Sequence, residues 1–140
     1  MKITLSDEAR RYIGLFDEQT EVSPTDCLVE SDRIVFLIPA GEMADAIGPD
    51  GRTVQRVEKL VGRRVELLED AETPEAFVEN MLAPAVVRGV TISEQGETVV
   101  AYVEVVEADR GVAIGTDGQH IKTARRLARR QFDIDDIQLT

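Results

Sequence analysis

The residues of this sequence best suited to chemistry lie in two four-residue turns that begin and end with glycine. Gly48–Gly51 reads Gly-Pro-Asp-Gly, and Gly115–Gly118 reads Gly-Thr-Asp-Gly. An amphipathic, arginine-bearing pattern follows each turn directly. A glycine turn at the start of a helix leaves backbone N–H groups uncovered at the positive end of the helix dipole, where a phosphate can bind. The chain therefore offers two candidate phosphate sites.

The two turns belong to a longer internal repeat. Ala46–Gly51 returns as Ala113–Gly118 after a shift of 67 residues. The same shift relates four apolar positions after each turn, which are Val54, Val57, Leu60 and Val61 in the first copy and Ile121, Ala124, Leu127 and Ala128 in the second. Their spacing places each set on one face of a helix. Further along, Val65–Leu68 maps loosely onto Phe132–Asp135. A repeat of this length predicts two similar modules.

The elements around the turns follow one order in both halves of the chain. In the first half, we expect a helix capped by Ser6, a hairpin, a short helix, the turn, a helix closed by Gly62, and a strand at 65–68. In the second half, the same order begins at Thr73 and ends with a strand at 134–139. We therefore predict an α/β (α+β) protein with domains at residues 1–70 and 71–140.

The charge balance argues against a nucleic-acid-binding protein, but the charge distribution argues for one. The net charge is −11, with 27 acidic and 16 basic residues, whereas nucleic-acid-binding proteins are usually basic. Five of the basic residues fall within 52–64 and six within 110–130, beside the two turns. The helix after the second turn is the more basic of the two, which favours the second turn as the binding turn.

The composition also indicates the salt concentration at which the protein works. Thirteen of the basic residues are arginine and only three are lysine. An acidic surface with little lysine suits a cytoplasm with molar salt, because the Debye length there is about 3 Å and repulsion between carboxylates is weak. We hypothesise a halophilic source. The alternative is an ordinary acidic protein.

Several function classes find no support in the sequence. The apolar runs are far shorter than the roughly 20 residues that span a bilayer, and the N-terminus has no apolar signal region. A single cysteine, Cys27, rules out an internal disulfide, and with a single histidine, His120, it leaves no Cys/His metal site. No phosphate-loop or dinucleotide-binding motif is present. We therefore expect a cytoplasmic protein with no cofactor that is not an enzyme and does not contact a membrane.

The element order, with Gly-x-x-Gly between the fourth and fifth elements, resembles a type II KH domain. Two such modules in tandem, joined by the short acidic segment 69–73, resemble the archaeal NusA-like transcription termination factors over nearly the whole chain. The resemblance implies two α-β-β-α-α-β domains that grip single-stranded RNA, about four nucleotides per turn. It further implies a role in transcription termination or antitermination on nascent RNA.

Two other functions fit the same fold. The first is a KH-fold protein-interaction module that docks on RNA polymerase and has little RNA affinity of its own. The second is a KH factor that serves ribosome assembly or RNA decay.

The resemblance places RNA contacts in both turns and beside them, at Ile47, Gly48, Pro49, Asp50, Gly51, Arg52, Arg56, Ile114, Gly115, Thr116, Asp117, Gly118, Lys122 and Arg125. The two isoleucines occupy positions that line the base groove in the family. Val54 and Ile121 either lie below that groove or belong to the core.

The aspartates are a departure from the family, which often places a basic residue within the turn. An ionised carboxylate repels a phosphate by about 1 kcal/mol at a few ångströms in water. Either Asp50 and Asp117 cap the following helices, or one or both turns have lost RNA binding and kept only the fold. For His120 the alternatives are a contact with base or phosphate and simple exposure at a helix start. Because counterion release contributes little in molar salt, we expect RNA affinity to depend only weakly on KCl.

Overall fold

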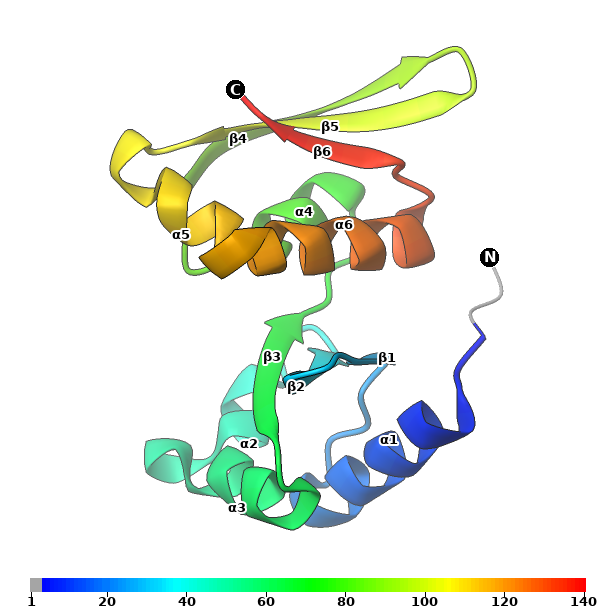
Figure 1. Cartoon of the computed structure of the whole chain (residues 1–140), viewed down its shortest axis with the longest axis vertical. Helices are drawn as coiled ribbons and strands as arrows, with labels where there is room; N and C mark the ends of the chain where they lie inside the picture. Colours follow the sequence, from blue (N-terminus) through cyan, green and yellow to red (C-terminus); the bar gives the residue numbers. More distant parts are fainter. Residues whose placement is uncertain (1–3) are drawn as a thin grey trace. The chain divides into compact units, whose positions relative to one another are not determined.

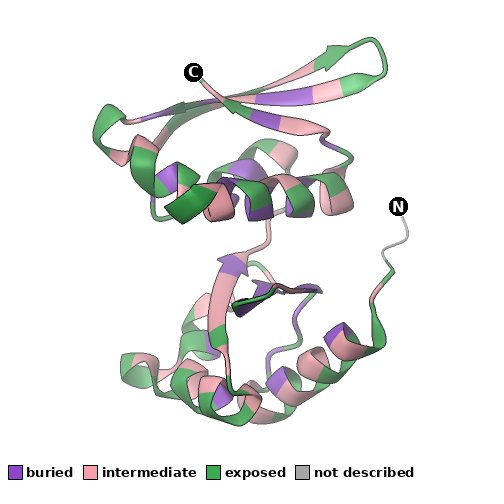
Figure 2. Ribbon diagram, in the orientation of Figure 1, coloured by how far each residue is buried: buried purple, intermediate pink, exposed green. Residues whose placement is uncertain are grey.

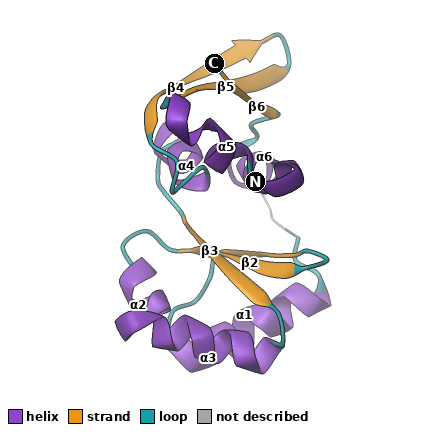
Figure 3. Cartoon of the chain, turned by 60° about the vertical axis from the view of Figure 1, so that its left-hand side comes forward, coloured by secondary structure: helices purple, strands orange, loops and turns teal. Residues whose placement is uncertain are grey.

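The computed structural model describes residues 4–140, which form two compact units, Thr4–Asp70 and Ala71–Thr140 (Figure 1). We call these the first and the second unit. Each contains one three-stranded sheet, and within each unit the helices lie on one face of that sheet (Figure 3). None of the helices in residues 4–140 has the length and apolar character needed to cross a membrane.

The first unit follows the element order that the sequence predicts. Its elements are α1 (Asp7–Thr20), β1 (Asp26–Val29), β2 (Arg33–Ile38), α2 (Met43–Ile47), the short 3-10 turn η1 (Pro49–Gly51), α3 (Arg52–Val61) and β3 (Arg64–Glu69). The Ser6 hydroxyl caps α1 by accepting a hydrogen bond from the Ala9 N–H at 3.0 Å, and Gly62 closes α3 in the left-handed conformation. Strand β2 lies between an antiparallel β1 and a parallel β3.

The second unit repeats this arrangement with longer strands and a longer last helix. Its elements are α4 (Pro74–Met81), β4 (Val87–Gln95), β5 (Thr98–Val105), η2 (Glu107–Asp109), α5 (Arg110–Ile114), η3 (Thr116–Gly118), α6 (Gln119–Phe132) and β6 (Asp136–Leu139). The Thr73 hydroxyl caps α4, and Pro74 occupies its first turn. Strand β5 pairs antiparallel with β4 and parallel with β6.

The strand register corrects the mapping of the last strands. Ile34 pairs with Val65, and its repeat partner Ala101 pairs with Ile137. Val65 therefore corresponds to Ile137, and the predicted match of Val65–Leu68 with Phe132–Asp135 is wrong. The reason is that α6 has 14 residues and α3 has 10, so the second chain segment returns to its sheet later.

Figure 2 shows buried residues on the helices and strands of both units. Each unit buries an aliphatic core that contains one aromatic pair. The rings of Phe16 and Phe36 lie 4.5 Å apart in the first unit, and those of Phe77 and Phe132 lie 5.0 Å apart in the second. All four predicted core positions of α6 are buried. In α3 the expectation is wrong for Leu60, which is 53% exposed. Leu60 lies in the last turn of its helix, whereas α6 continues past the equivalent position.

Candidate nucleic-acid interface

The two Gly-x-x-Gly turns have the same backbone geometry. Gly48 has φ 76° and ψ 171°, and Gly115 has φ 79° and ψ 172°. This region of backbone conformation is essentially restricted to glycine. The last glycine of each turn, Gly51 or Gly118, is left-handed and begins the long helix. Each turn therefore directs the chain from a short helix into α3 or α6 through a conformation that most residues do not adopt.

The first glycine of each turn packs directly against the start of the following helix. A Cβ added to Gly48 would collide with the side chain of Thr53 and stand 2.9 Å from its backbone nitrogen. A Cβ on Gly115 would stand 2.7 Å from the His120 Cβ and 2.9 Å from the His120 nitrogen. The first glycines therefore have a structural role, because they allow the turn to close onto its helix.

The second glycine of each turn has an open side. The nearest atom to a Cβ on Gly51 would be the Gln55 Nε2 at 3.9 Å, and near Gly118 the Lys122 Cε and Nζ would lie at 3.6 and 3.9 Å. These are ordinary van der Waals separations to the ends of flexible side chains. A ligand can therefore approach the backbone at the second glycine, beside an amide in the first unit and beside an ammonium group in the second.

The aspartates of the turns do not cap the helices. The helix starts at Gly51 and Gly118 have no side-chain cap among the residues that the structure describes. Asp50 and Asp117 instead adopt the left-handed conformation, with φ 53° and 54°, which Asn and Asp tolerate better than most residues. The capping interpretation is therefore wrong. Backbone conformation explains why both turns hold aspartate. The first N–H groups of α3 and α6, on Arg52 and Gln119, donate within the turns to the Pro49 and Thr116 carbonyls.

The charges beside the two turns are arranged differently. In the first unit the Asp50 carboxylate lies 3.6 Å from the Arg52 guanidinium, and both side chains are largely exposed. In the second unit Lys122 donates a hydrogen bond to the backbone carbonyl of Asp117 at 3.3 Å, and not to its carboxylate. The Lys122 ammonium group is thus held over the second turn.

The isoleucines before the turns are exposed, and one of the two groove candidates is core. Ile47 is 37% exposed and Ile114 is 39% exposed, at the ends of α2 and α5. Each turn therefore has a large, partly exposed apolar side chain directly before it. Ile121 is buried in the core, and Val54 is half-buried.

Three of the candidate side chains make hydrogen bonds within their own unit. Arg56 donates to the Gln19 carbonyl at 3.1 Å. Arg125 donates twice to the Ile137 carbonyl, at 3.0 and 3.2 Å, and lies 2.9 Å from Asp136. The His120 Nε2 lies 2.9 Å from the Ala83 carbonyl oxygen. These contacts give all three side chains a structural role that the sequence did not indicate.

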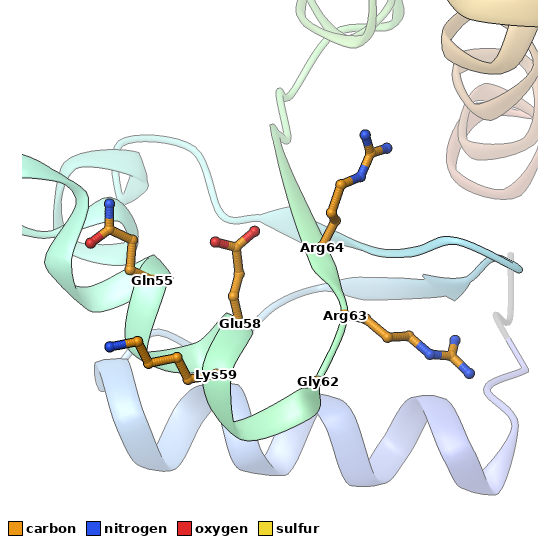
Figure 4. A pocket seen from close by; sticks show the side chains of 6 residues that line it. All are labelled: Gln55, Glu58, Lys59, Gly62, Arg63 and Arg64. Carbon is orange, nitrogen blue, oxygen red and sulfur yellow. The ribbon is translucent and has the colours of Figure 1, made fainter.

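A shallow concavity of about 470 Å³ lies in the first unit, next to the C-terminal half of α3 and the start of β3 (Figure 4). It is lined by Gln55, Glu58, Lys59, Gly62, Arg63 and Arg64. The Glu58 carboxylate accepts a hydrogen bond from the Val65 N–H at 3.0 Å. The sequence did not predict this surface. Its one signal there was the grouping of the basic residues within 52–64, which does not show that their side chains share a concavity.

The fold and the turns together define a class of nucleic-acid-binding protein. Two α-β-β-α-α-β units with a Gly-x-x-Gly turn before the last helix are tandem KH domains. Residues 10–78 match the KH domain family, and residues 74–140 match the NusA-like second KH domain. Both matches confirm the predicted fold class. The chain belongs to the NusA family of transcription termination proteins.

Individual relatives agree over the full length of the chain. The probable transcription termination protein NusA of Halococcus morrhuae is 62% identical over 99% of both chains. The protein of the same name from Halobacterium salinarum is 54% identical over all of both chains. The crystal structure of APE1850 matches 97% of this chain and all of its own, with a TM-score of 0.85 and 28% identity. The two sequence relatives come from halophilic archaea, which confirms the predicted halophilic, archaeal type.

Proposed function

We propose that this protein binds single-stranded RNA through its Gly-x-x-Gly turns and acts in the cytoplasm in transcription termination or antitermination. The observation that carries the proposal is the open second glycine of each turn, at a helix start with no side-chain cap. The names of the relatives from Halococcus and Halobacterium support the role in termination.

Each turn would hold the sugar–phosphate backbone, and the adjoining groove would hold the bases. The positive end of the helix dipole lies at the start of α3 and of α6, which favours an anion there. Thr116 and Lys122 add a hydroxyl and an ammonium group to the second turn. Ile47 and Ile114 would pack against bases, because both are exposed directly before the turns.

The acidic surface is compatible with this function in molar salt. Long-range repulsion between an anionic protein and RNA is screened beyond about 3 Å at 1 M salt. Short N–H to phosphate hydrogen bonds and apolar contacts with bases do not depend on long-range attraction. Binding would therefore rest on those contacts, and raising KCl within the molar range would weaken it only slightly.

The direct test is RNA binding in molar KCl. Fluorescence anisotropy would follow a labelled pool of single-stranded RNAs about ten nucleotides long, enough for two four-nucleotide clamps. The double variant Gly51→Asp/Gly118→Asp places a carboxylate at the open side of both turns. The matched control Gly51→Asn/Gly118→Asn has the same shape and a similar tolerance of the left-handed conformation, without the charge.

The proposal expects binding by the native chain, near-native binding by the asparagine control and loss of binding by the aspartate variant. If the native chain binds no single-stranded RNA but is retained on RNA polymerase, the protein is a docking module and the RNA proposal fails. RNA binding that survives in the aspartate variant would also contradict the proposal, because the RNA would then bind elsewhere.

A further inference from the structure

We propose that the second KH domain is the stronger of the two RNA clamps of this protein. The difference lies in the side chain four residues after the last glycine of each turn. That residue is Lys122 in the second domain and Gln55 in the first. The inference rests on the proposed RNA-binding function and adds which domain contributes more to the RNA affinity. It follows from comparing equivalent positions of two domains that share one backbone.

The first observation is the side chain beside the open glycine. The Lys122 Nζ lies 3.9 Å from the position that a Cβ on Gly118 would occupy, and the Gln55 Nε2 lies 3.9 Å from the same position at Gly51. The two side chains therefore reach back to equivalent places. Only the second domain puts a cation there, where a phosphate held by the turn would lie. Hydrogen bonds from a charged donor to phosphate are about twice as strong as those from a neutral donor.

The second observation is a reversal of charge farther along the same helices. Glu58 of α3 and Arg125 of α6 are repeat partners, and both side chains bond to the edge strand of their own sheet. Glu58 accepts from the Val65 N–H, whereas Arg125 donates to the carbonyl of Ile137, the residue that corresponds to Val65. At this position the helix therefore presents an anion to its edge strand in the first domain and a cation in the second.

The edge strands carry the opposite charges at the matching position. Asp136 of β6 corresponds to Arg64 of β3 by strand register, and Asp136 pairs with Arg125. Arg63 and Arg64 of the first domain lie beyond the C-terminal end of α3, away from its turn, and Arg63 is directed away from Gln55 (Figure 4). In the second domain the cations follow the helix that starts at the turn.

The cations near the first turn have partners inside the domain. Arg52 lies 3.6 Å from the Asp50 carboxylate, and Arg56 donates to the Gln19 carbonyl. Neither approaches the open side of Gly51 as closely as Gln55 does. Each turn carries one aspartate, but a phosphate at the first turn would meet the amide of Gln55, whereas a phosphate at the second would meet the ammonium group of Lys122.

Two pairs of matched variants of the full-length chain test the inference, with the labelled RNA pool in molar KCl. The first pair is Gly51→Asp and Gly118→Asp, and the second is Gln55→Lys and Lys122→Gln. We expect Gly118→Asp to weaken RNA binding at least about tenfold, and Gly51→Asp to weaken it by a clearly smaller factor. Lys122→Gln should weaken binding about threefold or more, and Gln55→Lys should leave it unchanged or strengthen it.

Thermal melting of each variant checks that it folds. The single asparagine variants at the two glycines control for the change in side-chain size. Equal losses in Gly51→Asp and Gly118→Asp would overturn the inference but leave the proposed function standing, as would a larger loss in Gly51→Asp. No effect of Lys122→Gln would also overturn it. If the native chain does not bind the RNA, the proposed function and the inference fail together. The same holds if both aspartate variants bind the RNA as tightly as the native chain does.

Discussion

Gly115 lies against His120 so closely that the two residues leave no room for a side chain on the glycine. A Cβ there would stand 2.7 Å from the His120 Cβ and 2.9 Å from the His120 nitrogen. Gly118, three residues later, has only the end of the Lys122 side chain nearby. The two glycines of one turn therefore serve different purposes, because one closes the turn and the other exposes the backbone.

This difference predicts unequal effects of alanine on stability. Gly115→Ala should destabilise the second domain by about 3 kcal/mol, because it combines a forbidden backbone conformation with a clash against backbone atoms. Gly118→Ala should lower stability by about 1 kcal/mol, from the left-handed conformation alone. Thermal melting in molar KCl measures both. Equal effects would show that the contact with His120 does not hold the turn closed.

The turn aspartates should oppose RNA binding without supporting the fold. Asp117→Asn keeps a residue that tolerates the left-handed conformation and removes the charge beside the bound phosphate. We expect the RNA affinity to rise about two- to fivefold at moderate salt, and less in molar KCl, where the charge is screened. Fluorescence anisotropy at both salt concentrations checks this. A fall in affinity would mean that the Asp117 carboxylate itself contacts the RNA.

The ion pair of Arg33 with Glu30 should matter even in molar salt. The Arg33 Nε and Glu30 Oε1 lie 2.7 Å apart, and the two side chains are only 7% and 13% exposed. Arg33→Ala removes the partner at 2.7 Å from a nearly buried carboxylate, so we expect a loss of about 3 kcal/mol in the free energy of unfolding.

The exposed pair of Arg64 with Asp32 is the matched control for Arg33. These charged groups lie 3.6 Å apart, and their side chains are mostly exposed. Arg64→Ala should lower stability by less than about 0.5 kcal/mol. Urea titration of both variants in molar KCl decides the point. Similar losses in the two variants would contradict the assignment of a buried, unscreened pair.

The C-terminal end of α1 offers a stabilising substitution. Glu21 caps this helix in the left-handed conformation, with φ 62°, and its N–H donates to the Asp17 carbonyl at 2.8 Å. Glu21→Gly relieves the backbone strain and removes an anion from the negative end of the helix dipole. We expect a gain of about 0.5–1 kcal/mol, allowing for the greater chain entropy of glycine.

Glu18→Gly is the control for Glu21→Gly, since Glu18 is an exposed residue inside the same helix. Glycine there should lower stability by about 1 kcal/mol. The melting temperatures of the two variants should therefore move in opposite directions. A decrease for both would show that the left-handed cap carries no strain worth relieving.

The sequence by itself determined the repeat, the two turns and the order of the elements. These follow from patterns within short segments: glycines where a turn needs positive φ, apolar residues at helical spacing in α6, and caps such as Ser6 and Gly62. The family followed from the same local patterns, because two turns at one fixed shift are a specific arrangement.

Only the tertiary structure decided what the side chains around the turns do. The bonds of Glu58 to Val65 and of Arg125 to Ile137 depend on strand register, and α6 is longer than α3, so one constant shift could not supply that register. The contact between Gly115 and His120 depends on how tightly a turn folds back on its helix. Spacing along a chain specifies which face of an element a residue occupies, but the atoms it meets there come from other elements.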